Sequence, residues 1–461
     1  MTTEMKISNV LCIGAGFVGG PTMAVMADRC PEIRFTVVDA NADRIRHWNS
    51  EKLPVFEPSL GEIIARVRDR NLFFQEPSPN AIAQADLVFV SVNTPTKQFG
   101  DGAGMAADLG NVEACAREIF AHARNDTIVV EKSTVPVRTA ETISRILHPQ
   151  VNGRRFHVLS NPEFLAEGSA VADLQNPDRV LIGHAPTRDG KSAAKALVNI
   201  YRRWVPRRKI LLCGVWSSEL SKLTANAMLA QRVSSINSIS AICEKTEADV
   251  GEISRAIGMD SRIGEKFLEA GVGFGGSCFR KDLLDLVYIC GNYGLHEVAA
   301  YWQTVLDIND FQTARFARMI VEKQFNTVAG KKVAVFGFAF KPETNDTRDS
   351  PAIQVCRHLL EERAELTITD PRALENAEKH FNGRAGSVRF EPDPYRAAHG
   401  AHAVVLLTHW PLYKELDYER IFAGMTKPAF FFDGRRYIDP KTLWKLGFNV
   451  YPIGAAPHTH I

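Results

Sequence analysis

A glycine-rich turn near the N-terminus constrains the fold more than any other stretch of the sequence. Residues 9–13 form an apolar run typical of a buried parallel strand, and Gly14-Ala-Gly16-Phe17-Val18-Gly19 follows it directly. We expect a helix over residues 21–26 and a second strand over 34–38, which ends at Asp39, 20 positions after Gly19. A strand, a glycine turn, a helix, a strand and an acidic residue in this order predict a Rossmann-like α/β domain that binds a dinucleotide.

The same stretch favours NAD as the cofactor. Backbone N–H groups of the glycine turn and the helix N-terminus would approach the pyrophosphate. Asp39 would accept hydrogen bonds from the adenosine ribose and repel a 2′-phosphate, although the nearby Arg44 weakens this preference unless it stacks on the adenine. The alternative is a glycine turn that binds no ligand. The expected cofactor contacts here are Gly14, Gly16, Phe17, Val18, Gly19, Asp39 and Arg44.

Composition excludes several other classes of protein. The chain has 461 residues, 45% of them hydrophobic and 23% charged, which indicates a globular protein of about three domains. The net charge of +2 gives no bulk attraction to nucleic acid or to a membrane surface, and no apolar run is long enough to span a bilayer. The eight cysteines are irregularly spaced without a CxxC pair, and the N-terminus lacks a signal-peptide pattern. We expect a reducing, cytoplasmic compartment and no metal site.

Polar clusters follow three later strands of the expected sheet. The strand over 85–92 ends at Val92 and leads into Asn93-Thr94-Pro95-Thr96, that over 127–131 leads into Lys132-Ser133-Thr134, and that over 156–160 leads into Asn161-Pro-Glu163-Phe164-Leu165-Ala166-Glu167-Gly168. Such domains bind ligands at the carboxyl ends of their strands, so we expect these clusters in the ligand crevice. Ordinary turn chemistry and an acidic surface loop are the alternatives. Residues 100–104 predict a flexible excursion.

The middle of the chain is expected to be helical. Ser217, Ser218 and Glu219 predict a helix cap, followed by one long helix to about residue 244. Lys222 and Asn226 are four residues apart and share a face of that helix among apolar neighbours, which favours a site over the usual solvated lysine. A second long helix, over 296–325, is expected to connect domains.

A second glycine-rich stretch, residues 271–282, contains a cysteine. It reads Gly-Val-Gly-Phe274-Gly275-Gly-Ser-Cys278-Phe-Arg280-Lys281-Asp282. Glycines let a backbone approach a ligand, and a helix over 282–289 would place its N-terminal dipole near Cys278. That dipole, with Arg280 and Lys281, would favour the thiolate and indicates a nucleophile. The alternative, a small packing thiol after a tight turn, is equally compatible with this stretch alone.

A second α/β pattern begins after residue 330 and has no GxGxxG motif. Its last expected strand, over 429–432, leads into Asp433-Gly434-Arg435-Arg436, a basic pair where a phosphate could bind, although such pairs are usually solvated. The predicted fold class is therefore α/β, with two Rossmann-like doubly wound domains joined by a central helical segment with a long connecting helix. The expected limits are 1–215, 216–328 and 329–461, and residues 455–461 look like a frayed tail.

NAD and a nucleophilic cysteine together suggest one kind of chemistry. Removal of a hydride from an alcohol gives an aldehyde, which a thiolate can trap as a thiohemiacetal. Removal of a second hydride gives a thioester, and hydrolysis releases an acid. A simple alcohol dehydrogenase needs no such cysteine. The residues expected around the reacting group are Cys278, Lys222, Asn226, Glu163 and Asp282.

Six motifs spread over nearly the whole chain resemble those of the UDP-glucose/GDP-mannose dehydrogenase family. They are Gly14–Gly19, Val92–Thr96, Glu131–Pro136, Asn161–Gly168, Gly273–Asp282 and Phe338–Lys341, and the Phe-Leu-Ala-Glu-Gly form is similar to the animal and plant branch. The resemblance implies twofold, NAD-dependent oxidation of UDP-glucose at C6 to UDP-glucuronate, through a thiohemiacetal and a thioester on a cysteine. It also implies a homodimer with the long helix from Glu219 in its core, and a homohexamer of such dimers.

The resemblance further implies roles for individual residues. Cys278 would be the nucleophile, Lys222 would exchange a proton with the C6 oxygen, and Glu163 would assist thioester hydrolysis. Asp282 and Thr134 would position water or Lys222, and Asn226 would bind the sugar. Further NAD contacts would come from Val92, Asn93, Thr94, Pro95, Thr96, Ser133, Thr134, Glu167, Lys281 and Arg348. The nucleotide sugar would contact Glu163, Phe164, Leu165, Ala166, Glu167, Lys222, Asn226, Phe267, Phe274, Gly275, Lys341, Arg435 and Arg436, with Arg262 supplied by a neighbouring subunit.

One position departs from the pattern of that family. Animal members often carry lysine where this chain has Glu269, so one substrate contact would be replaced. The residues alone also leave two other functions open. One is the same chemistry on GDP-mannose or a UDP-N-acetylhexosamine, and the other is a catalytically silent protein that binds a nucleotide sugar.

Overall fold

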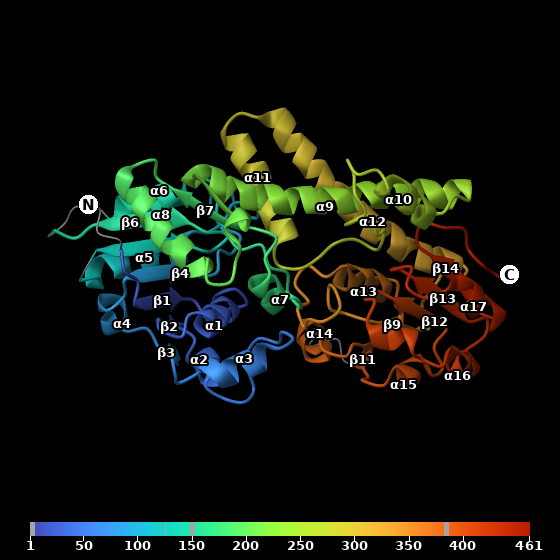
Figure 1. The fold of residues 1–461 in the computed structure, drawn as a ribbon. Helices are drawn as coiled ribbons and strands as arrows, with labels where there is room; N and C mark the ends of the chain where they lie inside the picture. The colour runs from blue at the N-terminus through green and yellow to red at the C-terminus, as the bar shows by residue number, and fades with distance from the viewer. Residues whose placement is uncertain (1–4, 125, 148–152, 382–386) are drawn as a thin grey trace. The chain divides into compact units, whose positions relative to one another are not determined.

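The chain forms two compact units (Figure 1). The computed structural model describes residues 5–124, 126–147, 153–381 and 387–461. The N-terminal unit comprises Met1–Ala225 and Leu284–Tyr293, and the C-terminal unit comprises Asn226–Leu283 and Gly294–Ile461. Each unit contains its own sheet of mostly parallel strands, which confirms the predicted α/β class with two doubly wound sheets and a helical segment. The three domain limits expected from the sequence stay a prediction.

The sheet of the N-terminal unit has eight strands within the described residues, in the order β3-β2-β1-β4-β5-β6-β7-β8. Apolar runs such as Leu-Val-Phe-Val in β4 are buried throughout, as expected of strands covered on both faces. Neighbouring strands are parallel from β3 to β6, whereas β7 is antiparallel to β6. The strands are β1 (Asn9–Ile13), β2 (Arg34–Val38), β3 (Leu72–Gln75), β4 (Leu87–Val90), β5 (Thr127–Glu131), β6 (Phe156–Ser160), β7 (Val180–His184) and β8 (Ile210–Gly214).

Helices cover both faces of this sheet. Apolar side chains of α1, α3, α7 and α8 form one core with the strands, and those of α4, α5 and α6 form another. The helices are α1 (Gly19–Arg29), α2 (Ala42–Trp48), α3 (Leu60–Val67), α4 (Pro79–Ala83), α5 (Gly110–His122), α6 (Thr139–Leu147), α7 (Ala170–Gln175), α8 (Arg188–Tyr201) and the 3-10 turn η1 (Arg207–Lys209). Because both faces are covered, polar side chains gather at the strand ends.

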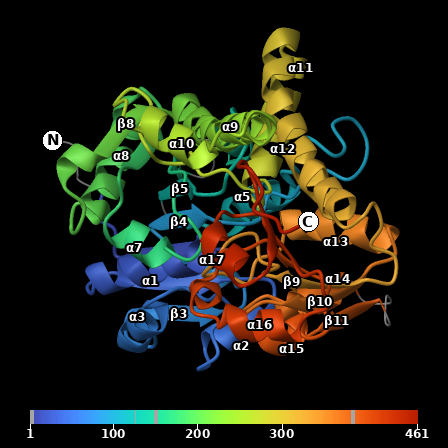
Figure 2. The ribbon, with the colours of Figure 1, turned by 90° about the vertical axis from the view of Figure 1, so that its right-hand side faces the viewer.

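The sheet of the C-terminal unit is parallel, in the order β11-β10-β9-β12-β13-β14. Helices α12, α13 and α14 form a core with one face and α15, α16 and α17 with the other; Figure 2 shows α13 above the sheet and α15 and α16 below it. The elements are β9 (Lys332–Phe336), α13 (Pro351–Glu361), β10 (Glu365–Thr369), α14 (Leu374–His380), β11 (Val388–Phe390), α15 (Pro394–Ala398), β12 (Ala403–Leu406), the 3-10 turn η2 (Pro411–Lys414), α16 (Tyr418–Gly424), β13 (Phe430–Asp433), α17 (Pro440–Lys445) and β14 (Asn449–Pro452).

Four helices follow one another in the middle of the chain, and two of them are long. They are α9 (Val215–Thr246), α10 (Val250–Gly258), α11 (Phe279–Asn292) and α12 (His296–Lys323). The predicted cap of α9 at residues 217–219 is wrong, because the helix begins at Val215, directly after β8. Ser218 is fully buried and its hydroxyl donates to the Ser160 carbonyl at 3.4 Å, so it packs against β6 instead of capping the helix. Among the described residues, no helix is long and apolar enough to cross a membrane.

Two segments that were expected to be loose are held by contacts. In the stretch over 100–104, the Ala106 amide donates to the Gly102 carbonyl at 2.8 Å, and a Cβ at Gly102 would lie 2.8 Å from the Tyr288 ring. In the C-terminal tail, His458 pairs with Val450 beside β14, and the His460 ring stacks on Trp444 at 5.1 Å between centroids. The prediction of a frayed tail is therefore wrong, because the sequence pattern does not reveal contacts with distant residues, whereas the flexibility of residues 100–104 stays a prediction.

Candidate active site

The glycine turn after β1 leaves open space where a pyrophosphate would fit. Gly14 has φ of +110°, and a Cβ there would collide with the Ser91 carbonyl. A Cβ at Gly19 would collide with the Gly14 carbonyl, so α1 can approach β1 only with glycine at that position. A Cβ at Gly16, by contrast, would meet no atom within 4 Å. The residues therefore fit a dinucleotide, because the backbone is exposed at Gly16 beside the N-terminus of α1.

Asp39, which follows β2, is buried and ionised. Its carboxylate accepts hydrogen bonds from the amides of Ala15 at 2.8 Å and Asn41 at 2.9 Å. Arg44 adds an ion pair at 2.8 Å while its own side chain stays 40% exposed. Burial opposes ionisation of Asp39, but these hydrogen bonds and the Arg44 charge outweigh it and lower the pKa. Arg44 thus pairs with the acid expected to bind the ribose.

Polar residues after β4 and β5 are joined, as their positions predicted. The Thr94 hydroxyl donates to the Thr134 carbonyl at 2.8 Å, and the Ser133 hydroxyl donates to the Val92 carbonyl at 2.7 Å. Both hydroxyls therefore tie together two loops that leave neighbouring parallel strands. This places Val92, Thr94, Ser133 and Thr134 at one edge of the N-terminal sheet, where such sheets bind ligands.

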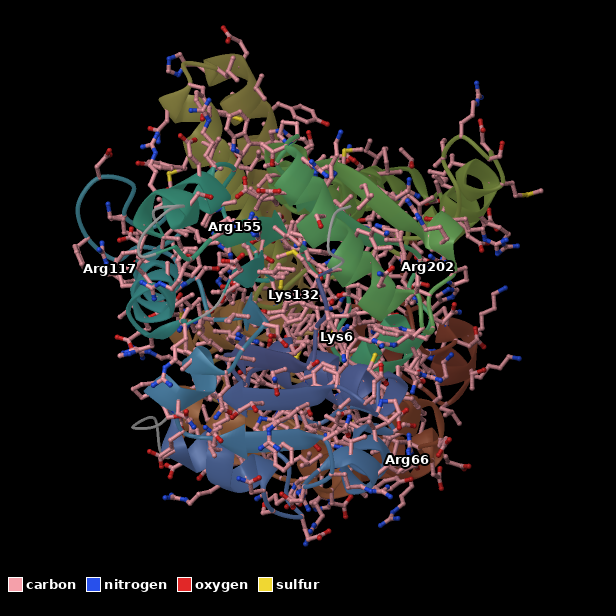
Figure 3. The ribbon with its side chains drawn as sticks, turned by 60° about the vertical axis from the view of Figure 1, so that its left-hand side comes forward. Lys6, Arg66, Arg117, Lys132, Arg155 and Arg202 are labelled. Carbon is pink, nitrogen blue, oxygen red and sulfur yellow. The ribbon has the colours of Figure 1, made fainter. Side chains whose placement is uncertain are left out.

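Lys132 and Glu163 form a buried ion pair beside these loops. The Lys132 ammonium lies 2.7 Å from the Glu163 carboxylate, and the two side chains are 3% and 17% exposed. Its other donors reach Asn161 Oδ1 at 3.2 Å and the Tyr201 hydroxyl at 3.3 Å, so all three ammonium donors have acceptors. Lys132 lies in the interior of the unit, whereas Arg66, Arg117 and Arg155 lie at its surface (Figure 3).

The ion pair fixes both the charge and the direction of Glu163. Burial opposes ionisation, but the Lys132 ammonium, the Phe164 amide and the Lys222 charge outweigh it and lower the pKa of Glu163. The Phe164 amide donates to Glu163 Oε1 at 2.8 Å. The sequence analysis named Lys132 in a polar cluster but predicted no individual role for it. Its place directly after a buried strand is the signal that could have indicated a buried partner.

Phe164 lies between two cations. The Arg179 guanidinium lies 3.7 Å from the Phe164 ring centroid and the Lys222 ammonium 5.4 Å from it. Lys222, on α9, is 7% exposed and so is not a solvated lysine, while its role as a site residue stays a prediction. Cation–π contact is favourable for desolvated ammonium and guanidinium groups. Phe164 therefore helps to hold Lys222 beside Glu163.

Glu57 anchors the rest of the loop that carries Glu163. Its buried carboxylate accepts hydrogen bonds from the amides of Gly168 at 2.7 Å and Ala170 at 3.0 Å, where α7 begins. Glu167 and Leu165 are half-buried and Ala166 is exposed. Sequence reasoning missed Glu57, because it lies far from this loop in the chain and belongs to no motif.

In the C-terminal unit, Cys278 lies exposed at the start of α11. Its carbonyl accepts the Asp282 amide at 2.9 Å, so the cysteine occupies the N-terminal cap of the helix, where the dipole favours a thiolate. The Ser277 hydroxyl lies 3.4 Å from its sulfur. The loop before it depends on glycine, because a Cβ at Gly275 would collide with the Asp349 carbonyl.

The two basic residues after Cys278 each pair with a carboxylate. Arg280 donates to Asp310 through both guanidinium nitrogens, at 2.8 and 3.1 Å, and Lys281 lies 2.9 Å from Asp282. Each charge is therefore partly offset by its carboxylate, and the expectation that both residues favour the Cys278 thiolate stays a prediction. The helix N-terminus is the remaining electrostatic support that the sequence predicted.

Asn226 and Asp282 meet inside the C-terminal unit. The Asn226 amide donates to the Asp282 carboxylate at 2.6 Å, and the residues are 5% and 0% exposed. Asp282 lies one helical turn after Cys278 on α11. Together with the Lys281 ion pair, this contact holds the Asp282 carboxylate in one orientation.

The structure distinguishes the two arginines after β13. Arg435 donates from Nε to the Leu407 carbonyl at 2.7 Å and from Nη1 to the Gly273 carbonyl at 3.4 Å, so its guanidinium lies against the cysteine loop. Burial lowers the pKa of Arg435 to about 10, while the carboxylates of Asp433 and Glu269 act in the opposite direction. Arg436 instead donates to both oxygens of Asp249 at 2.8 Å, at the start of α10. Arg435 is therefore the better candidate to bind a phosphate.

The remaining expected contacts in the C-terminal unit differ in exposure. Arg262 is exposed and pairs with Asp260, and Arg348 pairs with Asp346 through two nitrogens at 2.8 and 2.7 Å. Phe274 is buried and Phe267 is 42% exposed, and both rings contact Phe279. Lys341 is half-buried with its ammonium 5.6 Å from the Phe340 ring centroid. The exposed Arg262 side chain thus has its guanidinium paired with Asp260.

Family models match this chain in three consecutive parts. They describe the UDP-glucose/GDP-mannose dehydrogenase family, with an NAD binding domain at residues 8–205, a central domain at 216–311 and a UDP binding domain at 334–440. The first of these confirms the prediction that the cofactor is NAD.

Named relatives and a solved structure agree with these models. UDP-glucose 6-dehydrogenase of Caenorhabditis elegans is 54% identical over 462 residues, which cover 98% of this chain and 96% of that protein. The enzyme of the same name from Bos taurus is 55% identical over 464 residues, covering 97% and 93%. The structure of a UDP-glucose dehydrogenase from Pyrobaculum islandicum superimposes with a TM-score of 0.85 at 32% identity, covering 99% of each chain. The chain therefore belongs to the UDP-glucose/GDP-mannose dehydrogenase family.

Proposed function

We propose that the chain catalyses the NAD-dependent twofold oxidation of UDP-glucose at C6 to UDP-glucuronate. The observation that carries the proposal is the identity of more than half, over nearly the full length, with proteins named UDP-glucose 6-dehydrogenase. Bound NAD would supply the hydride acceptor for both oxidations. Gly14, Gly16, Asp39 and the loops after β4 and β5 would hold it, with Glu167, Lys281 and Arg348 as further contacts.

Lys222 would exchange a proton with the C6 oxygen, and Cys278 would form a covalent bond to C6. Lys222 would accept the proton of the C6 hydroxyl as the first hydride leaves C6, which gives an aldehyde. The Cys278 thiolate would then bond to C6, and Lys222 would return its proton to the oxygen, which gives the thiohemiacetal. The second oxidation would leave a thioester, with Lys222 again accepting the hydroxyl proton.

Glu163 would act in the hydrolysis of the thioester. Water adds to C6 and the C6–sulfur bond breaks. One proton of the water leaves with the Cys278 sulfur, the other passes to solvent, and the carboxylate is released. Because Lys132 lowers the pKa of Glu163, this carboxylate is a weak base at neutral pH. We therefore assign it the role of orienting the water, with Asp282 and Thr134 positioning water or Lys222.

Residues of the C-terminal unit would hold the nucleotide sugar. Arg435 would contact the diphosphate, with Lys341, Phe267, Phe274 and Gly275 around it and Asn226 on the sugar. Arg436 would support α10 through Asp249. Arg262 would come from a neighbouring subunit.

Exposed apolar side chains along α9 support the proposed homodimer, which would assemble into a hexamer. Trp216, Leu220, Met228 and Ile242 are 49%, 40%, 50% and 57% exposed on this helix. Large apolar side chains left exposed on one long helix are typical of a protein interface. We further propose a reducing, cytoplasmic compartment, in which the eight cysteines would not form disulfides.

The test is the stoichiometry of NADH formation with UDP-glucose. Two NADH per UDP-glucose are expected, and Cys278→Ser should stop the reaction before the acid is released. Release of the aldehyde after one NADH would contradict the cysteine mechanism. A panel with GDP-mannose and a UDP-N-acetylhexosamine at equal concentration tests the substrate, and binding of UDP-glucose without NADH would identify a silent binding protein instead.

A further inference from the structure

One buried acid in the N-terminal unit has no role in the proposed chemistry. Glu131 ends β5 and is 1% exposed, and no donor among the described residues reaches either of its carboxylate oxygens. It faces the carboxyl of Glu219, on α9, which is also 1% exposed. An ionised carboxylate that has neither a hydrogen bond nor a cation is very costly to bury, so one of the two acids must be neutral.

The surroundings of Glu219 identify it as the ionised member. Its two oxygens accept the amides of Arg138 and Ala140, each at 2.7 Å, at the N-terminus of α6. Amide donors and a helix N-terminus both stabilise negative charge. Glu131 receives no such donor from the described part of the chain, and therefore the proton belongs on Glu131.

The matching strand of the C-terminal unit shows what a buried carboxylate with donors looks like. Asp433 ends β13, which occupies the same place in its sheet as β5 does in the first. It accepts the amides of Arg435 at 2.9 Å, Tyr437 at 2.8 Å and Ile438 at 3.0 Å. The lack of donors at Glu131 is thus a local feature and not a consequence of the fold.

We propose that Glu131 keeps its proton at neutral pH and donates it to the Glu219 carboxylate, and that this acid pair positions the Ser133–Arg138 loop against the first turns of α9. Other charged groups nearby do not replace the proton. Glu141, on α6, adds negative charge, the Arg138 guanidinium lies 4.8 Å over the Trp216 ring, and Lys132 is committed to Glu163. Burial and the charge of Glu219 raise the pKa of Glu131 well above its ordinary value.

The acid pair joins two parts of the site. The loop that follows Glu131 carries Ser133 and Thr134, and Lys222 lies three residues after Glu219 on the same helix. The Glu219 carboxylate accepts hydrogen bonds at the end of that loop. Glu131, just before the start of the loop, donates its proton to the same carboxylate. The pair itself does not depend on which substrate is oxidised, but its effect on Lys222 rests on the proposed function.

Thermal unfolding of the full chain as a function of pH tests the proton. A carboxyl group whose pKa is higher in the folded state stabilises the folded chain, and this contribution is complete below the ordinary glutamate pKa. The contribution is lost as the pH rises through the folded-state pKa. Glu131→Gln keeps a donor of the same shape but cannot ionise. We expect the Tm of Glu131→Gln minus that of the parent to increase steadily as the pH rises above the ordinary glutamate pKa. A difference that does not change with pH would overturn the proposal.

Two matched variants separate the proton from a general packing effect. Asp433→Asn makes the same chemical change where three amides need an acceptor, so it should lower Tm at every pH. Glu131→Met keeps the volume but has no donor, and leaves Glu219 without its partner. We expect Glu131→Met to lower kcat about tenfold at constant KM for UDP-glucose, whereas Glu131→Gln stays within about twofold of the parent.

If Glu131→Met and Glu131→Gln have equal activity and equal Tm, the acid pair does not position the Ser133–Arg138 loop. If the parent forms no NADH with UDP-glucose, the proposed function fails, while the pH dependence of Tm still decides whether the pair exists. The two proposals therefore fail in distinguishable ways.

Discussion

Six strands of the N-terminal sheet have the same order as the six strands of the C-terminal sheet, yet the turn after the first strand leaves open space only in the N-terminal sheet. Strands β3-β2-β1-β4-β5-β6 correspond to β11-β10-β9-β12-β13-β14. The turns begin alike, because Gly14 and Gly337 both have positive φ, at 110° and 92°. Two residues later the first turn has Gly16 with open space, whereas the second has Ala339, which is 1% exposed. The fold supplies the crevice, and the side chains decide whether a pyrophosphate can enter it.

The acids after the second strands differ in the same way. The Asp39 carboxylate accepts hydrogen bonds from two backbone amides and forms an ion pair with the partly exposed Arg44. Asp370 is 3% exposed. Its carboxylate accepts hydrogen bonds from the amides of Phe338 at 2.7 Å and Ala339 at 3.0 Å and from the Trp410 indole at 3.1 Å. Two amides of its own turn also donate to it. Asp370 therefore has no acceptor capacity left for a ribose. An acid at the same place in the sheet is thus fully engaged by the fold in the C-terminal unit, whereas in the N-terminal unit it is the residue proposed to bind the ribose.

The largest expected effect concerns Lys132, a buried cation that has no counterpart after β13, where Gly434 follows the strand. Lys132→Met would leave the Glu163 carboxylate without its cation and should lower the free energy of unfolding by about 3 kcal/mol. Denaturant unfolding measures this, with Lys191→Met on the exposed face of α8 as the control. A loss below about 0.5 kcal/mol, as at the control site, would contradict the assigned pair.

The same variant carries a pH prediction. Because the pKa of Glu163 is lowered in the folded state, its ionisation stabilises above the ordinary glutamate pKa, and this stability is lost as the pH falls through the folded-state value. Without Lys132 the folded-state pKa rises, so the acid limb of the kcat profile should move to higher pH. An unchanged acid limb would mean that Glu163 does not act in the rate-limiting step.

The next effect compares the two arginines of the C-terminal unit. Arg435→Ala should raise KM for UDP-glucose about 30-fold, or ~2 kcal/mol, because it removes the guanidinium that faces the cysteine loop. Arg436→Ala should leave that KM within about twofold and lower stability by about 1 kcal/mol, since its partner is Asp249. Steady-state kinetics with saturating NAD measures both, and the reverse order of effects would exchange their roles.

The smallest effect tests the open glycine directly. Gly16→Val places a side chain in the space expected for the pyrophosphate, so KM for NAD should rise about tenfold, or ~1.4 kcal/mol, with Tm unchanged. Gly337→Val, at the position that corresponds to Gly14, is the contrasting change in the other sheet. It should lower Tm and leave KM for NAD unchanged, because its Cβ would collide with Thr408 in a left-handed backbone. Equal effects on NAD binding would remove the distinction between the two turns.

The sequence alone predicted the features that depend on neighbouring residues. The glycine turn with Asp39, the alternation of apolar strands with helices, the long helix with Lys222 and Asn226, and the cysteine loop follow from local spacing and backbone preference. These patterns were enough for the fold class and the cofactor, because a dinucleotide site is encoded within one short strand–turn–helix–strand segment.

Only the tertiary structure decided the partners of the charged residues. Lys132 with Glu163, Glu131 with Glu219, and Arg435 rather than Arg436 at the cysteine loop depend on contacts between residues far apart in the chain. The early start of α9, the antiparallel β7 and the paired C-terminal tail depend on such contacts as well. The physical reason is that burial sets the energy of a charge, and burial is a property of the packed chain, which local sequence does not specify.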